Sequence, residues 1–380
     1  MLILEILKYA AQGAPQPSPQ LASALCHADS QELQWALDAG LAPLICRGVR
    51  DCSEGEPISA ALADTLLGAD LTARVRHVTR VEAALDVMAA CVEVGASTTV
   101  LKGISISEQC YPAPHLRPMT DIDVHIAGQP YAEIESALLA RGYTPGSLVM
   151  DADAAHGSPL YSSQHSVWVE IHTSLFPGSS RLRHHPVLAD PTSSDHSVAA
   201  EFRGQPTRRL RDEAQLLYIA SYWTRDLTIN PIHPTLVTPL FDAVMLLRQS
   251  NATFDWDRLS AWMRDDQATA SLALMLSFLS RHSLVQVPER TVERARRGQH
   301  LLGPAETAVL DHLVDQYLVA GRPLSLINSW HVWQNLLQRG PRYAKTLLLP
   351  WRIAFPPGYP DRFDPAMQAD RLRRLIRRLQ

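Results

Sequence analysis

Two aspartates, Asp121 and Asp123, stand two residues apart in an apolar run, and Glu170 stands in a second run of the same kind. Because successive side chains of a β-strand point to opposite faces, the two aspartates would share one face of a strand and their apolar neighbours the other. Those neighbours are Ile122, Val124 and Ile126. A strand beside the first would bring Glu170 to the same face. Three carboxylates that converge in this way are hard oxygen donors suited to Mg²⁺ or Mn²⁺.

This donor set indicates phosphate chemistry. Mg²⁺ takes about six oxygen ligands in octahedral geometry, a few from carboxylates and the rest from water and phosphate. Two such ions about 3.5–4 Å apart can hold a nucleoside triphosphate, activate an attacking group and stabilise the departing pyrophosphate in an in-line displacement. The sequence therefore predicts a divalent metal site with Asp121, Asp123 and Glu170 as its ligands.

Three further residues stand where they could contact phosphate. Lys102 follows the apolar run Thr98–Leu101 and supplies a point charge, and Gly103 next to it would allow a close backbone approach. Arg117, four residues before Asp121, could add a forked pair of donors. His172 lies on the acidic face by strand alternation, and we expect it to orient a carboxylate rather than to react.

These motifs together resemble the uncharacterised nucleotidyltransferase family of the polymerase-β-like superfamily. The resemblance rests on Leu101-Lys102-Gly103, Tyr111-Pro112, Leu116-Arg117-Pro118-Met119-x-Asp121-Ile122-Asp123 and Val169-Glu170-Ile171-His172. It implies an α+β fold, in which a small mixed sheet with helices carries the three acids and largely helical segments flank it. It also implies transfer of a nucleoside monophosphate from an NTP such as ATP to a hydroxyl, phosphate or amine, with release of pyrophosphate.

The resemblance assigns roles to residues and shows two departures. Asp121, Asp123 and Glu170 would be the catalytic and metal-binding residues, with Glu170 helping to deprotonate the acceptor. Lys102, Gly103, Ser105 and Arg117 would contact the nucleotide. The superfamily's usual Gly-Ser pair reads Gly103-Ile104 here, with Ser105 one place late, and Glu170 stands where this family more often has Asp. A non-catalytic nucleotide- or partner-binding protein of the same fold is the main alternative, and a glycosyltransferase with a D-x-D metal site is a further one.

Helical patterns surround this region. Residues 1–11 and about 30–50 are predicted to be helices separated by a proline-rich stretch at 13–19. A third helix is predicted from Asp70 to Val94, with a stop at Gly95. Its apolar positions recur at intervals of three and four: Val78, Val81, Leu85, Met88 and Val92. A helix opening at Gln129-Pro130 should end at Gly142, and residues 145–159 are expected to form a hairpin or mobile loop beside the site.

The second half of the chain is predicted to be mostly helical. A start signal at Leu210–Glu213 precedes one helix, and Asp242 lies inside another run, Leu240–Leu247, where we expect a paired structural acid. The predicted organisation is a helical segment at 1–95, a catalytic core at 96–205 and a helical domain at 206–380. Tryptophans in the second half are interpreted as core residues, and His184-His185 lacks the companions of a zinc site.

Composition fits a cytoplasmic enzyme. The chain has 380 residues, 46% of them hydrophobic, and a formal net charge of −4, which excludes the general basic field of a dedicated nucleic-acid binder. Five scattered cysteines argue against a secreted disulfide framework, and no uncharged apolar run is long enough for a membrane span. Arginines alternate with leucines over residues 371–379, a basic amphipathic pattern typical of a solvated helix face or of contact with an acidic partner, such as a nucleic acid, an acidic carrier or a membrane surface.

Overall fold

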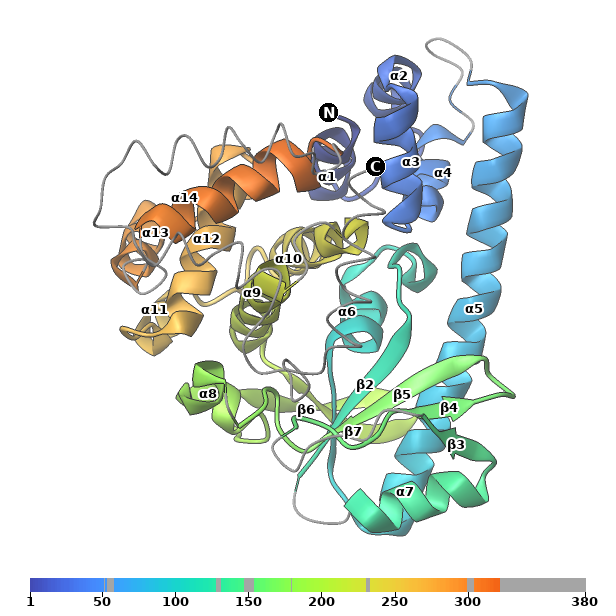
Figure 1. Ribbon diagram of the computed structural model, residues 1–380, viewed down its shortest axis with the longest axis vertical. Helices are drawn as coiled ribbons and strands as arrows, with labels where there is room; N and C mark the ends of the chain where they lie inside the picture. Colours follow the sequence, from blue (N-terminus) through green and yellow to red (C-terminus); the bar gives the residue numbers. More distant parts are fainter. Residues whose placement is uncertain are drawn as a thin grey trace, which may run out of the picture.

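Seven strands between Thr98 and Leu210 form one mixed sheet (Figure 1). The computed structural model describes residues 1–50, 52, 58–127, 131–146, 154–178, 180–229, 233–298 and 304–321. The strands are β1 (Thr98–Val100), β2 (Asp121–Ile126), β3 (Tyr143–Pro145), β4 (Leu160–Ser162), β5 (Val167–His172), β6 (Ser197–Phe202) and β7 (Gln205–Leu210). They are ordered β3-β4-β5-β2-β1-β7-β6. The pairs β2–β5 and β1–β7 are parallel and the other pairs are antiparallel.

Helices make up most of the rest. Those before the sheet are α1 (Leu2–Ala11), α2 (Pro19–His27), α3 (Ser30–Asp38), α4 (Ala42–Val49) and α5 (Ala60–Glu93). Those between strands are α6 (Lys102–Cys110), η1 (Pro114–Leu116), α7 (Tyr131–Ala140), η2 (Arg181–His184) and α8 (Pro186–Ala189). After the sheet come α9 (Asp212–Ile229), η3 (Pro234–Val237), α10 (Thr238–Gln249), α11 (Trp256–Trp262), α12 (Gln267–Arg281), α13 (Glu289–Arg296), α14 (Pro304–Leu313) and η5 (Val314–Leu318).

One face of the sheet is apolar and is covered by helices α5 and α7. Strand alternation puts Ile122 and Val124 of β2 on this face, together with Val169 of β5, and all three are fully buried. They pack in one hydrophobic cluster with Ala83, Val87 and Met88 of α5 and with Ile134 and Leu138 of α7. This packing fixes the orientation of β2 and β5, so their polar side chains must project from the opposite face.

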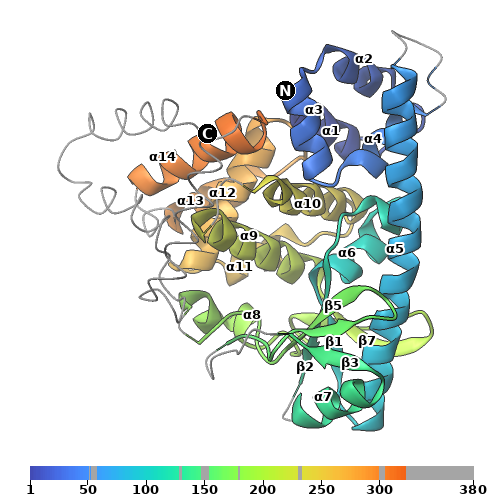
Figure 2. The ribbon, with the colours of Figure 1, turned by 45° about the vertical axis from the view of Figure 1, so that its right-hand side comes forward.

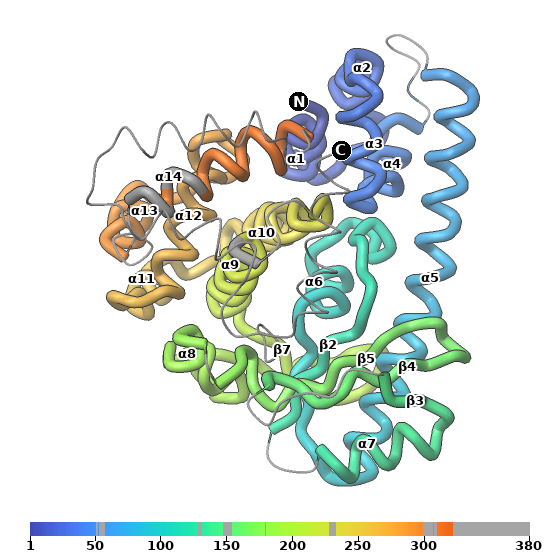
Figure 3. Tube along the Cα trace, in the orientation of Figure 1, coloured from blue at the N-terminus to red at the C-terminus, as the bar shows by residue number. Residues whose placement is uncertain are grey.

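A second core joins the two ends of the described chain. Helix α1 packs against α10, and α9 packs against α12. Residues from α1, α4, α9, α10 and α12 belong to one hydrophobic cluster. Figure 3 shows α1 beside α10 although they are far apart in the sequence, and Figure 2 shows α5 extending from the level of α4 to the sheet. The long helix α5 therefore connects the helical core to the sheet.

The predicted α+β fold with a mixed sheet and helical flanks is confirmed. Helices were predicted at α1, α7, α9 and α10, where the structure has them, and the run at 30–50 is divided into α3 and α4. Helix α2 was not predicted. It begins at Pro19, the last residue of the predicted proline-rich stretch, directly after Ser18, whose side chain caps the helix. The hairpin of β6 and β7 was not predicted.

The prediction for the long helix was too short. Helix α5 begins at Ala60, ten positions before Asp70, and its N-terminus is capped by the Ser59 side chain. Its predicted apolar face is partly wrong, because Val78 and Val92 are 57% and 56% exposed. The helix buries small residues such as Ala83 and Ala84 instead, which lets α5 lie close to the sheet.

Several predictions fall partly or wholly outside the described residues. These are the helix start at Gln129-Pro130, residues 147–153 of the loop at 145–159, the tryptophans at 330, 333 and 351, and the basic pattern at 371–379. Trp223 is fully buried, as expected of a core residue. The predicted domain boundary between residues 205 and 206 falls just after the first residue of β7, which pairs with β6. None of the helices in the described part of the chain is long and apolar enough to cross a membrane.

Candidate active site

The acids of the two strands lie side by side on the polar face of the sheet. Strands β2 and β5 pair in parallel with Asp123 opposite Glu170 and Asp121 opposite Trp168. The alternation of β2 places both aspartates on one face, and that of β5 places Glu170 and His172 on the same face. The sheet thus brings together Asp121, Asp123, Glu170 and His172, which are far apart in the sequence.

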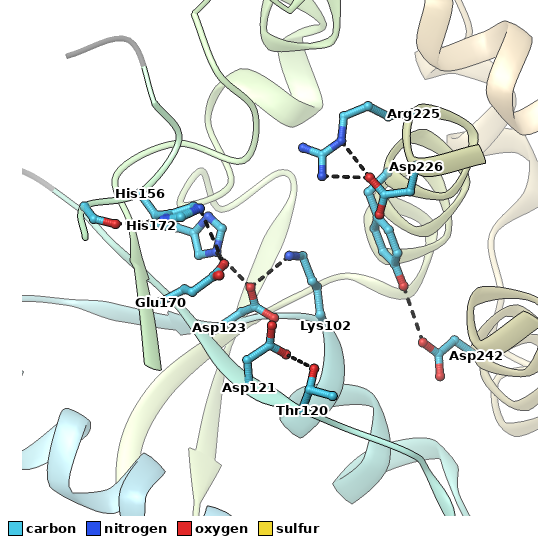
Figure 4. Close-up of polar contacts among 12 residues, drawn as sticks. Lys102, Thr120, Asp121, Asp123, His156, Glu170, His172, Arg225, Asp226 and Asp242 are labelled. Atoms are coloured by element: carbon cyan, nitrogen blue, oxygen red, sulfur yellow. Dashed lines mark hydrogen bonds and ion pairs between the residues drawn. The ribbon is translucent and has the colours of Figure 1, made fainter. Parts of the chain in front are cut away.

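Asp123 is the centre of the hydrogen-bond network at this site. Its Oδ1 atom accepts a hydrogen bond from Lys102 Nζ at 2.8 Å and another from His172 Nε2 at 2.8 Å. Figure 4 shows Lys102 on one side of Asp123 and Glu170 with His172 on the other. Asp123 and His172 are 2% and 3% exposed, so this contact is shielded from water. A charged hydrogen bond of this kind fixes the carboxylate before any ligand arrives.

The two aspartates have opposite pKa shifts. Burial raises the pKa of Asp121 to about 6, and the charge of Asp123 adds to this shift. Burial also acts on Asp123, but the Lys102 ammonium and the His172 hydrogen bond outweigh it and hold the pKa of Asp123 well below its usual range. Among the described residues, Asp121 accepts one hydrogen bond, from Thr120 Oγ1 at 3.3 Å. At neutral pH the site therefore holds two neighbouring carboxylates whose charges are unequally compensated.

Glu170 is held between two histidines. Its Oε2 atom lies 3.5 Å from His156 Nε2 and 3.6 Å from His172 Nε2. Burial opposes ionisation, but the His172 hydrogen bond outweighs it and lowers the pKa of Glu170. The pKa of His172 is raised, because its hydrogen bonds to Asp123 and Glu170 outweigh the effect of burial. A contact with both acids is consistent with an orienting role for His172.

Three residues form a group that could hold a metal ion. The potential ligand atoms of Asp123, Glu170 and His172 all lie within 4.8 Å of one another. Within the described residues, no other group of three or more such side chains lies this close together. Asp121 is not part of it, but Figure 4 shows its carboxylate beside that of Asp123. Carboxylate oxygens on one buried face, with an excess of negative charge at Asp121, fit a hard divalent cation. Asp123 and Glu170 of the predicted metal site belong to this group, His172 adds a nitrogen donor, and metal binding by Asp121 stays a prediction.

Lys102 reaches the acids from the first residue of α6. This helix follows β1 directly, and Lys102 has a φ of 37°, a left-handed conformation that non-glycine residues rarely adopt. Strain of this kind persists where the surroundings fix the residue. Here Nζ is held by Asp123 and lies 5.7 Å from the centre of the Tyr222 ring. Lys102 and the backbone N–H groups at the start of α6 therefore place positive charge beside the carboxylates.

The other predicted nucleotide-binding residues contact neighbouring groups of the fold. A Cβ atom on Gly103 would lie 2.8 Å from Arg117 Nη1 and 2.8 Å from Met119 Sδ, so this glycine permits close packing of α6. Ser105 is buried and accepts a hydrogen bond from Gln109 Nε2 at 2.8 Å. In the described contacts, only Lys102 of the four touches an acid of the site.

Arg117 is paired with Asp242 of α10. Its Nε and Nη2 atoms donate to the two carboxylate oxygens at 2.8 and 2.7 Å, and both side chains are buried. The hydroxyl groups of Tyr111 and Tyr222 donate to the same carboxylate at 3.0 and 3.5 Å. The structure therefore shows the paired, structural acid expected at Asp242, and a phosphate contact by Arg117 remains a prediction.

Sequence reasoning missed two neighbours of the site. His156 lies in the segment 145–159 that was expected beside the site but was not itself selected, and a bridge to His172 brings it to Glu170. Tyr222, beside Lys102, lies on a helix whose apolar pattern gave no reason to select it. His125 of β2 is buried next to His172 in the sheet, and burial lowers its pKa to about 4. A local sequence pattern carries no signal for such contacts, because they depend on strand pairing and helix packing.

Comparison with known proteins gives one structural match and one family. No curated protein matches the chain. The solution structure of the antibiotic-resistance factor ANT(2'')-Ia matches with a TM-score of 0.34 and 15% sequence identity, covering 54% of this chain and 94% of that chain. A likeness at this level carries no argument about this protein. The family model described as uncharacterised nucleotidyltransferase matches residues 28–282, which include every acid of the site, and the chain belongs to this family.

Proposed function

We propose that the protein is a Mg²⁺- or Mn²⁺-dependent nucleotidyltransferase that moves a nucleoside monophosphate from an NTP to an acceptor. The observation that carries the proposal is the pairing of β2 with β5, which places Asp121, Asp123 and Glu170 on one buried face next to Lys102, in a member of a nucleotidyltransferase family. Asp121, Asp123 and Glu170, with His172 beside them, would hold the metal. When bound, the metal would supply positive charge for the triphosphate and for the developing charge on the attacking and leaving oxygens.

The reaction is an in-line displacement at the α-phosphorus. An oxygen or nitrogen atom of the acceptor forms a bond to the α-phosphorus, the bond between the α-phosphorus and its bridging oxygen to the β-phosphate breaks, and pyrophosphate leaves. Glu170 is ionised and lies opposite Asp123, so it can accept the proton that the acceptor loses. Lys102, at the start of α6, would bind the phosphate oxygens of the leaving group.

Lys102 has two alternative partners in this scheme. Its ammonium holds Asp123 in the structure, at 2.8 Å. A bound cation would compensate the same carboxylate, and Lys102 could then turn to the triphosphate. Support for this exchange comes from Tyr222, whose ring lies 5.7 Å from Nζ and can stabilise the ammonium as it changes partner.

Transfer of labelled α-phosphate tests the proposal. We would incubate the full-length protein with α-phosphate-labelled ATP, GTP, CTP or UTP, with Mg²⁺ or Mn²⁺, and a cell extract divided into protein, nucleic-acid and small-molecule fractions. We expect one fraction to be labelled by the wild type and not by Asp121→Asn or Asp123→Asn. Glu170→Asp, which restores the acid that the family more often has, should retain transfer, whereas Glu170→Gln should lose it.

Binding measurements distinguish this proposal from its alternative. Metal-dependent binding of an NTP without label in any fraction would favour a non-catalytic nucleotide-binding protein, and equal transfer by wild type and Asp123→Asn would contradict the proposed site. Asp257→Asn serves as a matched control, because the Asp257 side chain lies on α11, is 77% exposed and pairs with Arg290 of α13 rather than with a residue of the sheet.

A further inference from the structure

Tyr161 and Trp168 form an aromatic pair on the sheet face that carries the acids. Their ring centroids lie 4.9 Å apart, with the ring planes inclined by 48°. The register places Tyr161 of β4 opposite Trp168 of β5, and Trp168 opposite Asp121 of β2. Because residues opposite each other in a sheet share a face, the two rings continue the row of side chains that begins at Asp121.

Trp168 is exposed, which is unusual for a residue of its size. Its exposed fraction is 42%, and it is the one aromatic residue among the large exposed hydrophobics of the described residues. An indole gains much of its stabilising effect from burial, so an exposed one beside a polar site indicates a contact surface. Cross-strand packing on Tyr161 accounts for the ring contact but leaves the exposed part of the indole unused.

The indole of Trp168 packs against Gly146 and Tyr161. A Cβ atom on Gly146 would lie 3.1 Å from Cζ3 and 3.4 Å from Cη2 of Trp168, so the ring packs directly against the backbone of this glycine. Contact with Gly146 on one side and with Tyr161 on another restricts the rotamers of Trp168. A rigid aromatic ring binds a flat partner with little loss of conformational entropy.

The position of the pair indicates which substrate meets it. In the sheet order β4-β5-β2-β1, the acids of β2 lie between the aromatic pair on β4 and β5 and the β1 side, from which α6 and Lys102 emerge. In an in-line displacement the attacking and leaving groups lie on opposite sides of the phosphorus. If Lys102 binds the leaving pyrophosphate, the acceptor must approach over Glu170 and Trp168.

We propose that Trp168, supported by Tyr161, binds the acceptor through a flat ring next to the atom that attacks the phosphorus. This inference rests on the proposed function. The shared chemistry is a flat face that packs on an indole, and it can come from an aromatic ring or from the C–H face of a sugar ring. The aromatic pair would thus select the acceptor and leave binding of the NTP unchanged.

Kinetics of Trp168 variants in the transfer assay test the inference. We would measure the transfer rate as a function of acceptor-fraction concentration and, separately, of NTP concentration. Trp168→Ala should raise the acceptor concentration needed for half-maximal rate about tenfold or more, by loss of a stacking contact. Its KM for the NTP should change less than about twofold. Trp168→Phe, which keeps a ring, should recover most of the acceptor affinity.

Leu139→Ala is the matched control, because Leu139 is 41% exposed but lies on α7, against the other face of the sheet. It should leave both concentration dependences unchanged. Mass spectrometry of the labelled product, compared with the mass of the transferred nucleoside monophosphate, then shows whether the acceptor moiety carries an aromatic or a sugar ring, and an acceptor moiety with neither would overturn the inference. So would an unchanged acceptor dependence in Trp168→Ala, or an effect on the NTP alone. Absence of transfer by the wild type would instead overturn the proposed function, and with it this inference.

Discussion

At the scale of single residues, the site combines two carboxylates with different environments. In the part of the chain that the structure describes, Asp123 has two charged or polar partners on one oxygen, whereas Asp121 accepts a single hydrogen bond from a neighbouring hydroxyl. Burial and the charge of Asp123 raise the pKa of Asp121 to about 6. An ionised Asp121 is therefore a cost to the fold until a cation binds, which is common at sites built for function rather than for stability.

Asp121→Asn should stabilise the metal-free protein. A carboxyl group whose pKa is higher in the folded than in the unfolded state destabilises the fold above the folded pKa of about 6, and this effect vanishes below the unfolded value of about 4. We expect a gain of about 1–3 kcal/mol at pH 7.5 in EDTA, seen as a rise in Tm of one to a few degrees, and no gain at pH 4. Thermal unfolding at the two pH values measures it.

Addition of Mg²⁺ should make the wild type more stable than Asp121→Asn, the reverse of the order in EDTA. Ligand binding to the folded state stabilises the wild type, and the variant that has lost a ligand oxygen gains less. Asp257→Asn, at an exposed carboxylate, should follow the wild type under every condition. A variant that is less stable than the wild type at pH 7.5 in EDTA would show that Asp121 is compensated by a group other than those described.

At the scale of elements, β2, β5 and the start of α6 determine the site. The alternation of polar and apolar residues in the sequence was sufficient to predict that Asp121 and Asp123 share a face. It was not sufficient to predict that β2 and β5 are parallel neighbours with Asp123 opposite Glu170, because strand pairing depends on contacts along the whole chain. The family resemblance implied a small mixed sheet that carries the three acids, without the direction or register of its strands.

Arg117 shows the same limit for helix packing. Its position before Asp121 suggested a phosphate contact, but α10 brings Asp242 to it from more than a hundred residues away. No local pattern contains that information. The face of α5 was also misread, since Val78 is exposed while small residues of the same helix are buried against the sheet. Composition and periodicity thus predicted elements better than the contacts between them.

The backbone at the start of α6 gives a prediction of its own. Lys102 has a φ of 37°, which costs a residue with a Cβ atom about 1 kcal/mol or more relative to glycine. Both Lys102→Ala and Lys102→Gly remove the ammonium from Asp123, so both should lose stability and activity. Lys102→Gly should nevertheless be more stable than Lys102→Ala by about 1 kcal/mol. Urea denaturation of the pair measures the difference.

Gln109, in the same helix, provides the control. Gln109 does not have a positive φ, so Gln109→Gly should be less stable than Gln109→Ala by about 0.5–1 kcal/mol, the reverse of the order at Lys102. Equal signs at the two positions would show that Lys102 does not hold its left-handed conformation in solution.

At the scale of the whole molecule, the buried pair of Arg117 and Asp242 connects the sheet to the C-terminal helices. Arg117 precedes β2, and Asp242 lies in α10, which itself packs against α1 and α6. Removal of one partner leaves a buried charge without compensation. Arg117→Met and Asp242→Leu should each therefore cost about 3–5 kcal/mol, and the double variant should cost clearly less than the sum of the two. Urea midpoints of the three variants measure this coupling.

An exposed pair sets the scale for comparison. The side chains of Arg290 and Asp257 are 72% and 77% exposed, and Nη2 of the arginine lies 2.9 Å from Oδ1 of the aspartate, so Arg290→Met should cost less than about 1 kcal/mol of stability.

Because a Cβ on Gly103 would contact Arg117, loss of the guanidinium also removes a packing partner of α6 and should shift Lys102 relative to Asp123. We therefore expect Arg117→Met to reduce nucleotidyl transfer under conditions in which it is folded, without contacting the substrate. Additive costs in the double variant, or full activity of folded Arg117→Met, would argue that the pair neither couples the two parts of the molecule nor positions α6.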